Sequence, residues 1–219
     1  MNEPQLTDKG EPLGLPTAIL IMGPTGSGKT PLGDLLETRG IHGRRTRHFD
    51  FGSILRNYTA SPSGILTKEE LAVVRNSLAS GALLEDRHFS IAEKLLAEFI
   101  RDDLNPGAEI IVMNGLPRHT GQSAALSKLI NIKAIVVLDS TSEVIFERIA
   151  RDTGGDRCKR TDDGLDHISR RLQIFRDRTL PLLDYYERTG RTKLIHLTVG
   201  ITTTAEDAFK ELNEQLADL

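Results

Sequence analysis

Residues 23–30 read Gly-Pro-Thr-Gly-Ser-Gly-Lys-Thr and directly follow the apolar run 17–22, Thr-Ala-Ile-Leu-Ile-Met. The order Gly-x-x-x-x-Gly-Lys-Thr between a buried strand and a helix predicts a loop that binds phosphate. Its glycines let successive backbone N–H groups converge on the anion, and the positive end of the helix adds to the attraction. In such a loop Lys29 reaches the β- and γ-phosphates of a nucleotide, and the Thr30 hydroxyl binds Mg²⁺.

The composition is that of an ordinary globular protein. The chain has 219 residues, of which 38% are hydrophobic and 27% are charged, and this length suits one α/β domain. The net charge of −3 offers no basic surface for nucleic acid, and no apolar stretch approaches the ~20 residues of a membrane span. The single Cys158 cannot form an internal disulfide, and residues 1–5 do not resemble a signal peptide. We therefore expect a cytoplasmic protein without nucleic-acid or membrane partners.

Short apolar runs alternate with longer amphipathic stretches along the chain. Residues 1–16 are polar and rich in proline and glycine, which predicts an N-terminal tail. Strands are expected at 18–22, 47–51, 109–113, 133–138 and 193–197, and helices at 29–39, 53–59, 68–79, 86–102, 119–129, 142–151, 164–187 and 204–217. Strands that alternate with helices favour a parallel sheet with right-handed crossovers, and therefore an α/β fold.

One polar segment interrupts this alternation. Residues 151–164 read Arg-Asp-Thr-Gly-Gly-Asp-Arg-Cys-Lys-Arg-Thr-Asp-Asp-Gly and have no apolar period. A solvated surface loop would explain the composition. However, a mobile loop that carries arginines between two helices is also what a lid over phosphates requires.

Five arginines are candidates for binding phosphate. Arg56 and Arg118 each follow an expected strand, and ligands of open parallel sheets bind beyond the carboxyl ends of the strands. A guanidinium makes two parallel bonds to phosphate oxygens and stays charged at any working pH. The other three lie in the second half of the chain: Arg148, Arg160 and Arg171.

A series of short motifs after the phosphate loop resembles, in the same order, the adenylate kinase family of nucleoside monophosphate kinases. The resemblance runs from about Ile19 to the C-terminus. It rests on Gly52-Ser-Ile-Leu-Arg56, Ser80-Gly-Ala-Leu-Leu-Glu-Asp86, Gly115-Leu-Pro-Arg118 with Gln122, Glu147-Arg148-Ile149, Arg160-Thr-Asp-Asp163 with Arg171, Thr179-Leu-Pro-Leu-Leu183 and Tyr185-Tyr186.

This resemblance implies a fold and a division of the chain. The fold is the three-layer P-loop kinase fold, in which a five-stranded parallel sheet has helices on both faces. A single domain would span 17–219, with a mobile monophosphate-binding insert at 51–84 and a short lid at 151–164. Such a lid is too small for a zinc-bearing subdomain, so Cys158 is expected to be a structural or incidental thiol. The family also favours a monomer.

The resemblance further implies the reaction and its residues. ATP would transfer its γ-phosphate to a nucleoside monophosphate, with AMP as the favoured acceptor and Mg²⁺ as the metal. ATP would be bound by Gly23, Gly26, Ser27, Gly28, Lys29, Thr30 and Arg148. The acceptor would be bound by Phe51, Gly52, Arg56, Leu83, Leu84, Gly115, Arg118, Gln122, Arg160 and Arg171. The catalytic side chains would be Lys29, Arg118, Arg148, Arg160 and Arg171.

Three positions depart from the family pattern. Asn114 stands where the family has an aspartate that orients Mg²⁺-bound water, so we expect weaker Mg²⁺ dependence or lower turnover, and a gain of activity in Asn114→Asp. Phe51 replaces a common threonine near the acceptor base; it can stack on a base or end a strand as a core aromatic. Pro31 follows the loop where the family often has threonine.

Other functions share parts of this pattern. P-loop transferases that prenylate tRNA would need a nucleic-acid surface, which the acidic balance does not offer. Guanylate- or shikimate-type kinases share the loop but not the motifs around Arg118 and Arg160. A catalytically weakened nucleotide-binding protein, and a kinase for UMP, CMP or another small acceptor, remain alternatives because of Asn114 and Phe51.

Overall fold

The computed structural model describes residues 14–62, 64–105, 107–156, 164–190 and 192–216. In this part of the chain the elements follow the order β1 (Thr17–Met22), α1 (Lys29–Arg39), β2 (Arg45–Asp50), α2 (Phe51–Ala60), α3 (Lys68–Ser80), η1 (Asp86–His88), α4 (Phe89–Asp102), β3 (Glu109–Asn114), α5 (Thr120–Leu126), β4 (Asn131–Asp139), α6 (Ser142–Ala150), α7 (Leu165–Ile174), η2 (Phe175–Thr179), α8 (Pro181–Thr189), β5 (Lys193–Thr198) and α9 (Ala205–Gln215). No described helix is both long enough and apolar enough to cross a membrane.

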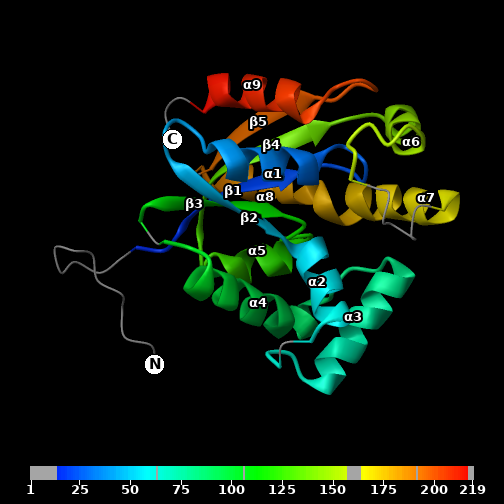
Figure 1. Cartoon of the computed structure of the whole chain (residues 1–219). Helices are drawn as coiled ribbons and strands as arrows, with labels where there is room; N and C mark the ends of the chain where they lie inside the picture. The colour runs from blue at the N-terminus through cyan, green and yellow to red at the C-terminus, as the bar shows by residue number, and fades with distance from the viewer. Residues whose placement is uncertain (1–13, 63, 106, 157–163, 191, 217–219) are drawn as a thin grey trace.

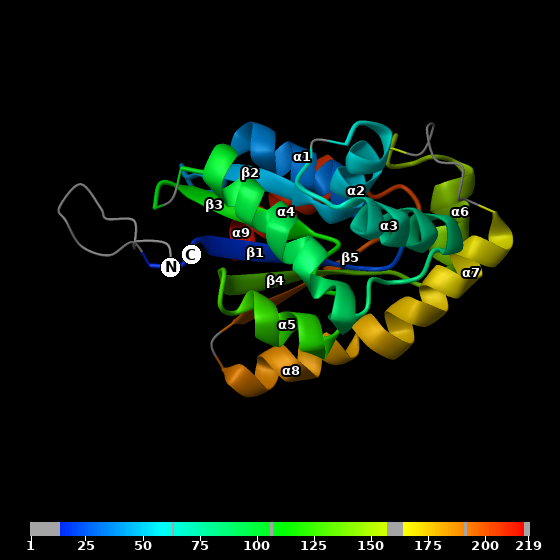
Figure 2. The same ribbon diagram turned by 90° about the horizontal axis from the view of Figure 1, so that it is seen from below.

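The strands form one parallel sheet in the order β2-β3-β1-β4-β5. Successive side chains of a strand point to opposite faces, and both faces are covered here. Leu20 of β1 packs with α4, α5 and α8 on one face, while Ile19 and Ile21 pack with α1 and α9 on the other. Figure 1 shows α1 and α9 on one side of the sheet, and Figure 2 shows α4, α5 and α8 on the opposite side. The predicted three-layer α/β fold is confirmed.

Helices α2 and α3 extend away from the sheet as a pair (Figure 1). Asp50 caps the first of them, because its Oδ1 accepts a hydrogen bond from the Ser53 backbone N–H at 3.0 Å. Thr67 and Glu70 form a reciprocal capping box at the start of the second. These two helices lie within residues 51–84, and the monophosphate-binding role of that segment stays a prediction.

The helix predicted at 164–187 is interrupted. It divides into α7 and α8, joined by the π-helical turn η2 (Phe175–Thr179). Pro181 has no N–H, and its ring would clash with the carbonyl four residues earlier in a regular helix. The Leu180 N–H accordingly bonds to the Phe175 carbonyl, five residues back, at 2.9 Å.

Close packing of α1 on β2 depends on Gly33. A Cβ atom at this position would lie 2.2 Å from Nε2 of His48, whose side chain is 3% exposed. The imidazole is also held by Asp34, with Nδ1 and Oδ1 2.8 Å apart. The helix therefore needs a glycine at the contact.

We predict that Gly33→Ala lowers the free energy of unfolding by about 1–3 kcal/mol, the usual cost of overpacking. In a His48→Ala background the same change should stabilise the protein by up to ~1 kcal/mol, because alanine is the better helix former once the clash is gone. Urea denaturation of the four variants measures both values. Equal effects in the two backgrounds would contradict the proposed contact.

Candidate active site

The carboxyl ends of β1, β2 and β3 meet at one edge of the sheet. In the register of the strands Asp50 pairs with Asn114, and Asn114 pairs with Ile21 of β1. The phosphate loop leaves β1 here, α2 leaves β2, and the segment that contains Arg118 leaves β3. Together with α3 and α7 these segments line a cavity of about 180 Å³.

The phosphate loop has the backbone that its glycines predict. Gly26 and Gly28 have φ values of 78° and 97°, a region that side chains other than glycine rarely adopt. A Cβ at Gly26 would also lie 2.7 Å from Cγ1 of Ile149. Lys29 begins α1, and its ammonium donates to the carbonyls of Gly23 and Pro24 at 2.8 and 2.6 Å. The lysine is thus held at the loop that it is expected to serve.

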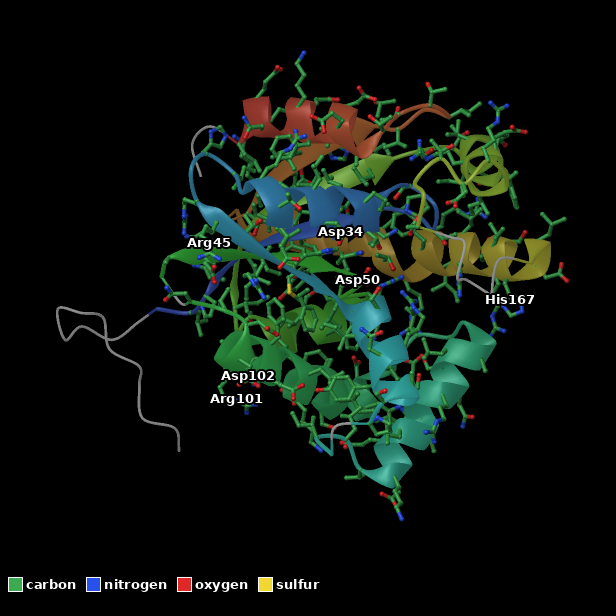
Figure 3. All side chains as sticks on the ribbon, viewed as in Figure 1. Asp34, Arg45, Asp50, Arg101, Asp102 and His167 are labelled. Atoms are coloured by element: carbon green, nitrogen blue, oxygen red, sulfur yellow. The ribbon has the colours of Figure 1, made fainter. Side chains whose placement is uncertain are left out.

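Beside this lysine, three polar side chains form a short chain of hydrogen bonds. The Thr30 hydroxyl donates to Oδ2 of Asp50 at 2.7 Å, and Nδ2 of Asn114 donates to the same hydroxyl at 3.1 Å. Figure 3 labels Asp50 at the junction of β2 and α2. Asp50 was not among the residues predicted from the sequence.

Asp50 carries a negative charge in this setting. Burial raises its pKa, but the hydrogen bonds from Thr30 and from the Ser53 backbone, with the charges of His48 and Arg56, outweigh that effect. The pKa therefore lies below the ordinary value of 3.8. The negative charge of ionised Asp50 can balance the positive charges of Arg56 and Arg118, with which it interacts.

Arg118 is fixed by its backbone as well as by its side chain. Its N–H donates to Oε1 of Gln122 at 2.7 Å, and its carbonyl accepts from the Thr179 hydroxyl at 3.1 Å. Its Nε donates to the Gly115 carbonyl at 2.8 Å. Loss of solvent lowers the pKa of the guanidinium, and the carboxylate of Asp50 opposes this shift. The arginine therefore presents a positioned charge to the cavity.

The structure brings most of the remaining predicted acceptor residues to the same cavity. Arg56 is exposed at its rim, where Nη2 donates to the Ser53 hydroxyl at 2.9 Å. Arg171 of α7 also lines the cavity. The other lining residues among the predicted set are Phe51, Gly52, Leu83, Leu84, Gly115 and Gln122.

Gln122 and Phe51 have clear structural roles at this cavity. The Gln122 amide joins two lining segments, since its Nε2 donates to the Leu84 carbonyl at 2.9 Å. An amide nitrogen carries two hydrogens, so the same group can also donate to a base. Phe51 is 6% exposed and stacks on Phe49, with ring centroids 6.1 Å apart. Phe51 is thus a core aromatic whose remaining surface lines the cavity.

Arg148 contacts the phosphate loop but is not one of the residues that line the main cavity. It is 3% exposed; Nε donates to the Gly26 carbonyl at 3.1 Å, and Nη1 donates to the carbonyls of Gly200 and Thr203 at 2.7 Å each. The guanidinium therefore joins the phosphate loop to the segment between β5 and α9. A small second cavity beside it is lined by Ser27 and Gly28.

Part of the predicted site falls outside the described residues. Arg160 and Cys158 lie in residues 157–163, as does the centre of the predicted lid. Arg151, the first residue of the predicted lid, is described. Its guanidinium forms an exposed ion pair, 3.0 Å long, with Glu147, which precedes it by four residues. Asp156 lines the main cavity.

This arrangement agrees with comparisons with known proteins. A family model described as an AAA domain matches residues 22–169. An adenylate kinase from Xanthomonas campestris pv. campestris (strain B100) is 32% identical over 181 residues, which cover 79% of this chain and 87% of that relative. An adenylate kinase from Synechococcus sp. (strain WH7803) is 30% identical over 180 residues, covering 78% and 85%.

The chain belongs to the adenylate kinase family. A third relative, an adenylate kinase from Thermus thermophilus, is 29% identical over 184 residues, 81% of this chain and 87% of its own. This member of the family is therefore a P-loop phosphotransferase, and ATP is the phosphate donor in its family.

We predict that Arg118→Lys lowers kcat/KM for the acceptor by roughly 100-fold, or about 3 kcal/mol, because an ammonium loses the bond to Gly115 and the paired bonds to phosphate. Steady-state kinetics with varied acceptor measure the change. Arg101→Lys is the control, since Arg101 forms an exposed ion pair with Asp102 at the end of α4, away from Asp50 (Figure 3). Equal activity of the two variants would contradict a phosphate contact by Arg118.

We predict that Arg148→Met lowers the free energy of unfolding by about 3 kcal/mol, because buried carbonyls lose a charged donor. It should also raise KM for ATP more than KM for the acceptor, since Arg148 holds the phosphate loop at Gly26 and this loop is expected to bind ATP. Arg151→Met, at an exposed ion pair, should cost under ~1 kcal/mol. A fall in kcat alone, with unchanged stability, would instead place Arg148 at the transferring phosphoryl group.

Proposed function

We propose that this protein transfers the γ-phosphate of ATP reversibly to AMP and so forms two molecules of ADP. The observation that carries the proposal is the cavity shared by the phosphate loop and by Arg56, Arg118 and Arg171. A loop for a triphosphate and a separate set of arginines imply two phosphate-bearing substrates. The acceptor is named AMP because the relatives at 30–32% identity are adenylate kinases.

The chain's own residues account for most of the chemistry. The loop N–H groups and Lys29 would hold the donor phosphates, and Arg118 with Arg56 would hold the acceptor phosphate. A phosphate oxygen of the acceptor is already a competent nucleophile, so no general base is needed. The site therefore acts by aligning two phosphates in line and by neutralising their charge. Arg160 and Arg171 would complete the charge around the transferring group.

The donor set around Thr30 fits Mg²⁺, which prefers oxygen ligands and keeps several of its waters. The hydroxyl of Thr30 is oriented by Asp50, and Asn114 lies within 3.1 Å of it. Thr30 would bind the ion directly, and Asn114 would contact its water. When bound, the ion neutralises the β- and γ-phosphate oxygens. The walls of the cavity would keep bulk water, a competing acceptor, away from the reacting phosphates.

A coupled assay tests the proposed acceptor. The protein is supplied with ATP, Mg²⁺ and one of AMP, GMP, CMP, UMP or dTMP, and ADP formation is followed. We expect the highest kcat/KM with AMP. Lys29→Met should bind AMP but turn over at least ~100-fold more slowly, because it lacks the charge on the donor phosphates.

The other outcomes each contradict a stated part of the proposal. A higher kcat/KM with UMP or CMP would keep the reaction but replace the acceptor. Tight nucleotide binding without turnover on any acceptor would indicate a nucleotide-binding protein that has lost catalysis.

A further inference from the structure

We propose that Asp50, at the end of β2, is the residue that positions the metal site, in place of the missing carboxylate at Asn114. This inference rests on the proposed function, because it assigns a role at the same donor site. It concerns three side chains that meet where β2 and β3 end beside the phosphate loop: Thr30, Asp50 and Asn114. The strand register places Asp50 and Asn114 directly opposite each other.

The hydrogen bonds of Thr30 decide which of the two neighbours can orient it. A hydroxyl has one hydrogen and two acceptor lone pairs. Here the hydrogen goes to Oδ2 of Asp50 at 2.7 Å, and one lone pair accepts from Nδ2 of Asn114 at 3.1 Å. The bond to Asp50 therefore directs the oxygen lone pairs away from the carboxylate, and the lone pair that does not accept from Asn114 can bind a cation. Asn114 in this orientation occupies a lone pair and supplies no charge.

The carboxylate is itself rigidly held. Its other oxygen, Oδ1, accepts from the Ser53 backbone N–H at 3.0 Å at the start of α2. A carboxylate has about four lone-pair sites, so two accepted bonds leave capacity for a metal-bound water. Residues that hold a metal ligand in this way set its orientation and basicity.

Charge supports the same assignment. Asp50 lies within electrostatic range of Arg118 and Arg56 on the acceptor side, and it is bonded to Thr30 on the donor side. A negative charge here offsets the positive charge of the cation and of the arginines that surround two anionic substrates. At this edge of the sheet the carboxylate thus stands on β2, at Asp50, and β3 ends in the uncharged Asn114.

This placement changes the expectation for Asn114→Asp. Taken alone, the substitution would set a second carboxylate against the Thr30 hydroxyl, whose only hydrogen already goes to Asp50, so the two acceptors would face each other without a donor between them. We therefore expect no gain of activity in the single variant. The gain is expected in an Asp50→Asn background, where the exchange leaves one carboxylate at the site.

The test measures metal binding in the absence of any acceptor. Binding of Mn²⁺ to the protein–ATP complex is titrated by electron paramagnetic resonance for the wild type, Asp50→Asn, Asn114→Asp and the double variant. Asparagine also caps helices well, so Asp50→Asn removes the charge while it keeps the start of α2. We expect Asp50→Asn to weaken Mn²⁺ binding roughly 10- to 100-fold, and the double variant to recover most of that loss.

Cooperative thermal unfolding without metal and ATP binding without metal are the structural readouts, and Asp50→Asn should retain both. If that variant does not fold, Asp50→Ser supplies a second uncharged cap for the same titration. Wild-type Mn²⁺ affinity in the folded, uncharged variant would overturn the proposal. So would a loss that Asn114→Asp does not recover. Failure of AMP as acceptor would leave these binding results unaffected, so the two proposals are tested separately.

Discussion

The whole site depends on one constraint, the adjacency of the carboxyl ends of β2, β3 and β1 in a parallel sheet. Each strand end releases a different functional segment: the phosphate loop after β1, α2 after β2 and the Arg118 segment after β3. Because the strands are hydrogen-bonded neighbours, these segments cannot separate without breaking the sheet. Residues far apart in the sequence are thereby held within reach of one another.

Backbone contacts then hold the charged groups in place. Arg118 is tied through its N–H, its carbonyl and its Nε, while Arg148 joins the phosphate loop to the segment before α9. The π-helical turn before Pro181 ends at Thr179, whose hydroxyl supplies one of these bonds. Packing and backbone hydrogen bonds thus prepare the site before substrates bind, which reduces the entropic cost of aligning them.

Local patterns in the sequence predicted what depends on local structure. The bounds of α1 match the predicted helix 29–39, and the phosphate loop follows from eight consecutive residues. The role proposed for Asp50 could not be predicted in the same way, because an aspartate at the end of a strand is also an ordinary helix cap. That role depends on β2 lying beside β3, and local sequence patterns do not predict the order of the strands in a sheet. Arg148 was likewise identified as a candidate, but its carbonyl partners lie more than fifty residues away along the chain.

We propose that one chain holds a triphosphate and a monophosphate end to end in a single cavity. Calorimetric titration with two adenosines joined by five phosphates tests it directly, since the linker spans both phosphate positions and the transferring group between them. We expect one molecule bound per chain, at least ~100-fold more tightly than ATP, because the second half binds intramolecularly. Two molecules bound per chain, or an affinity equal to that of ATP, would contradict it.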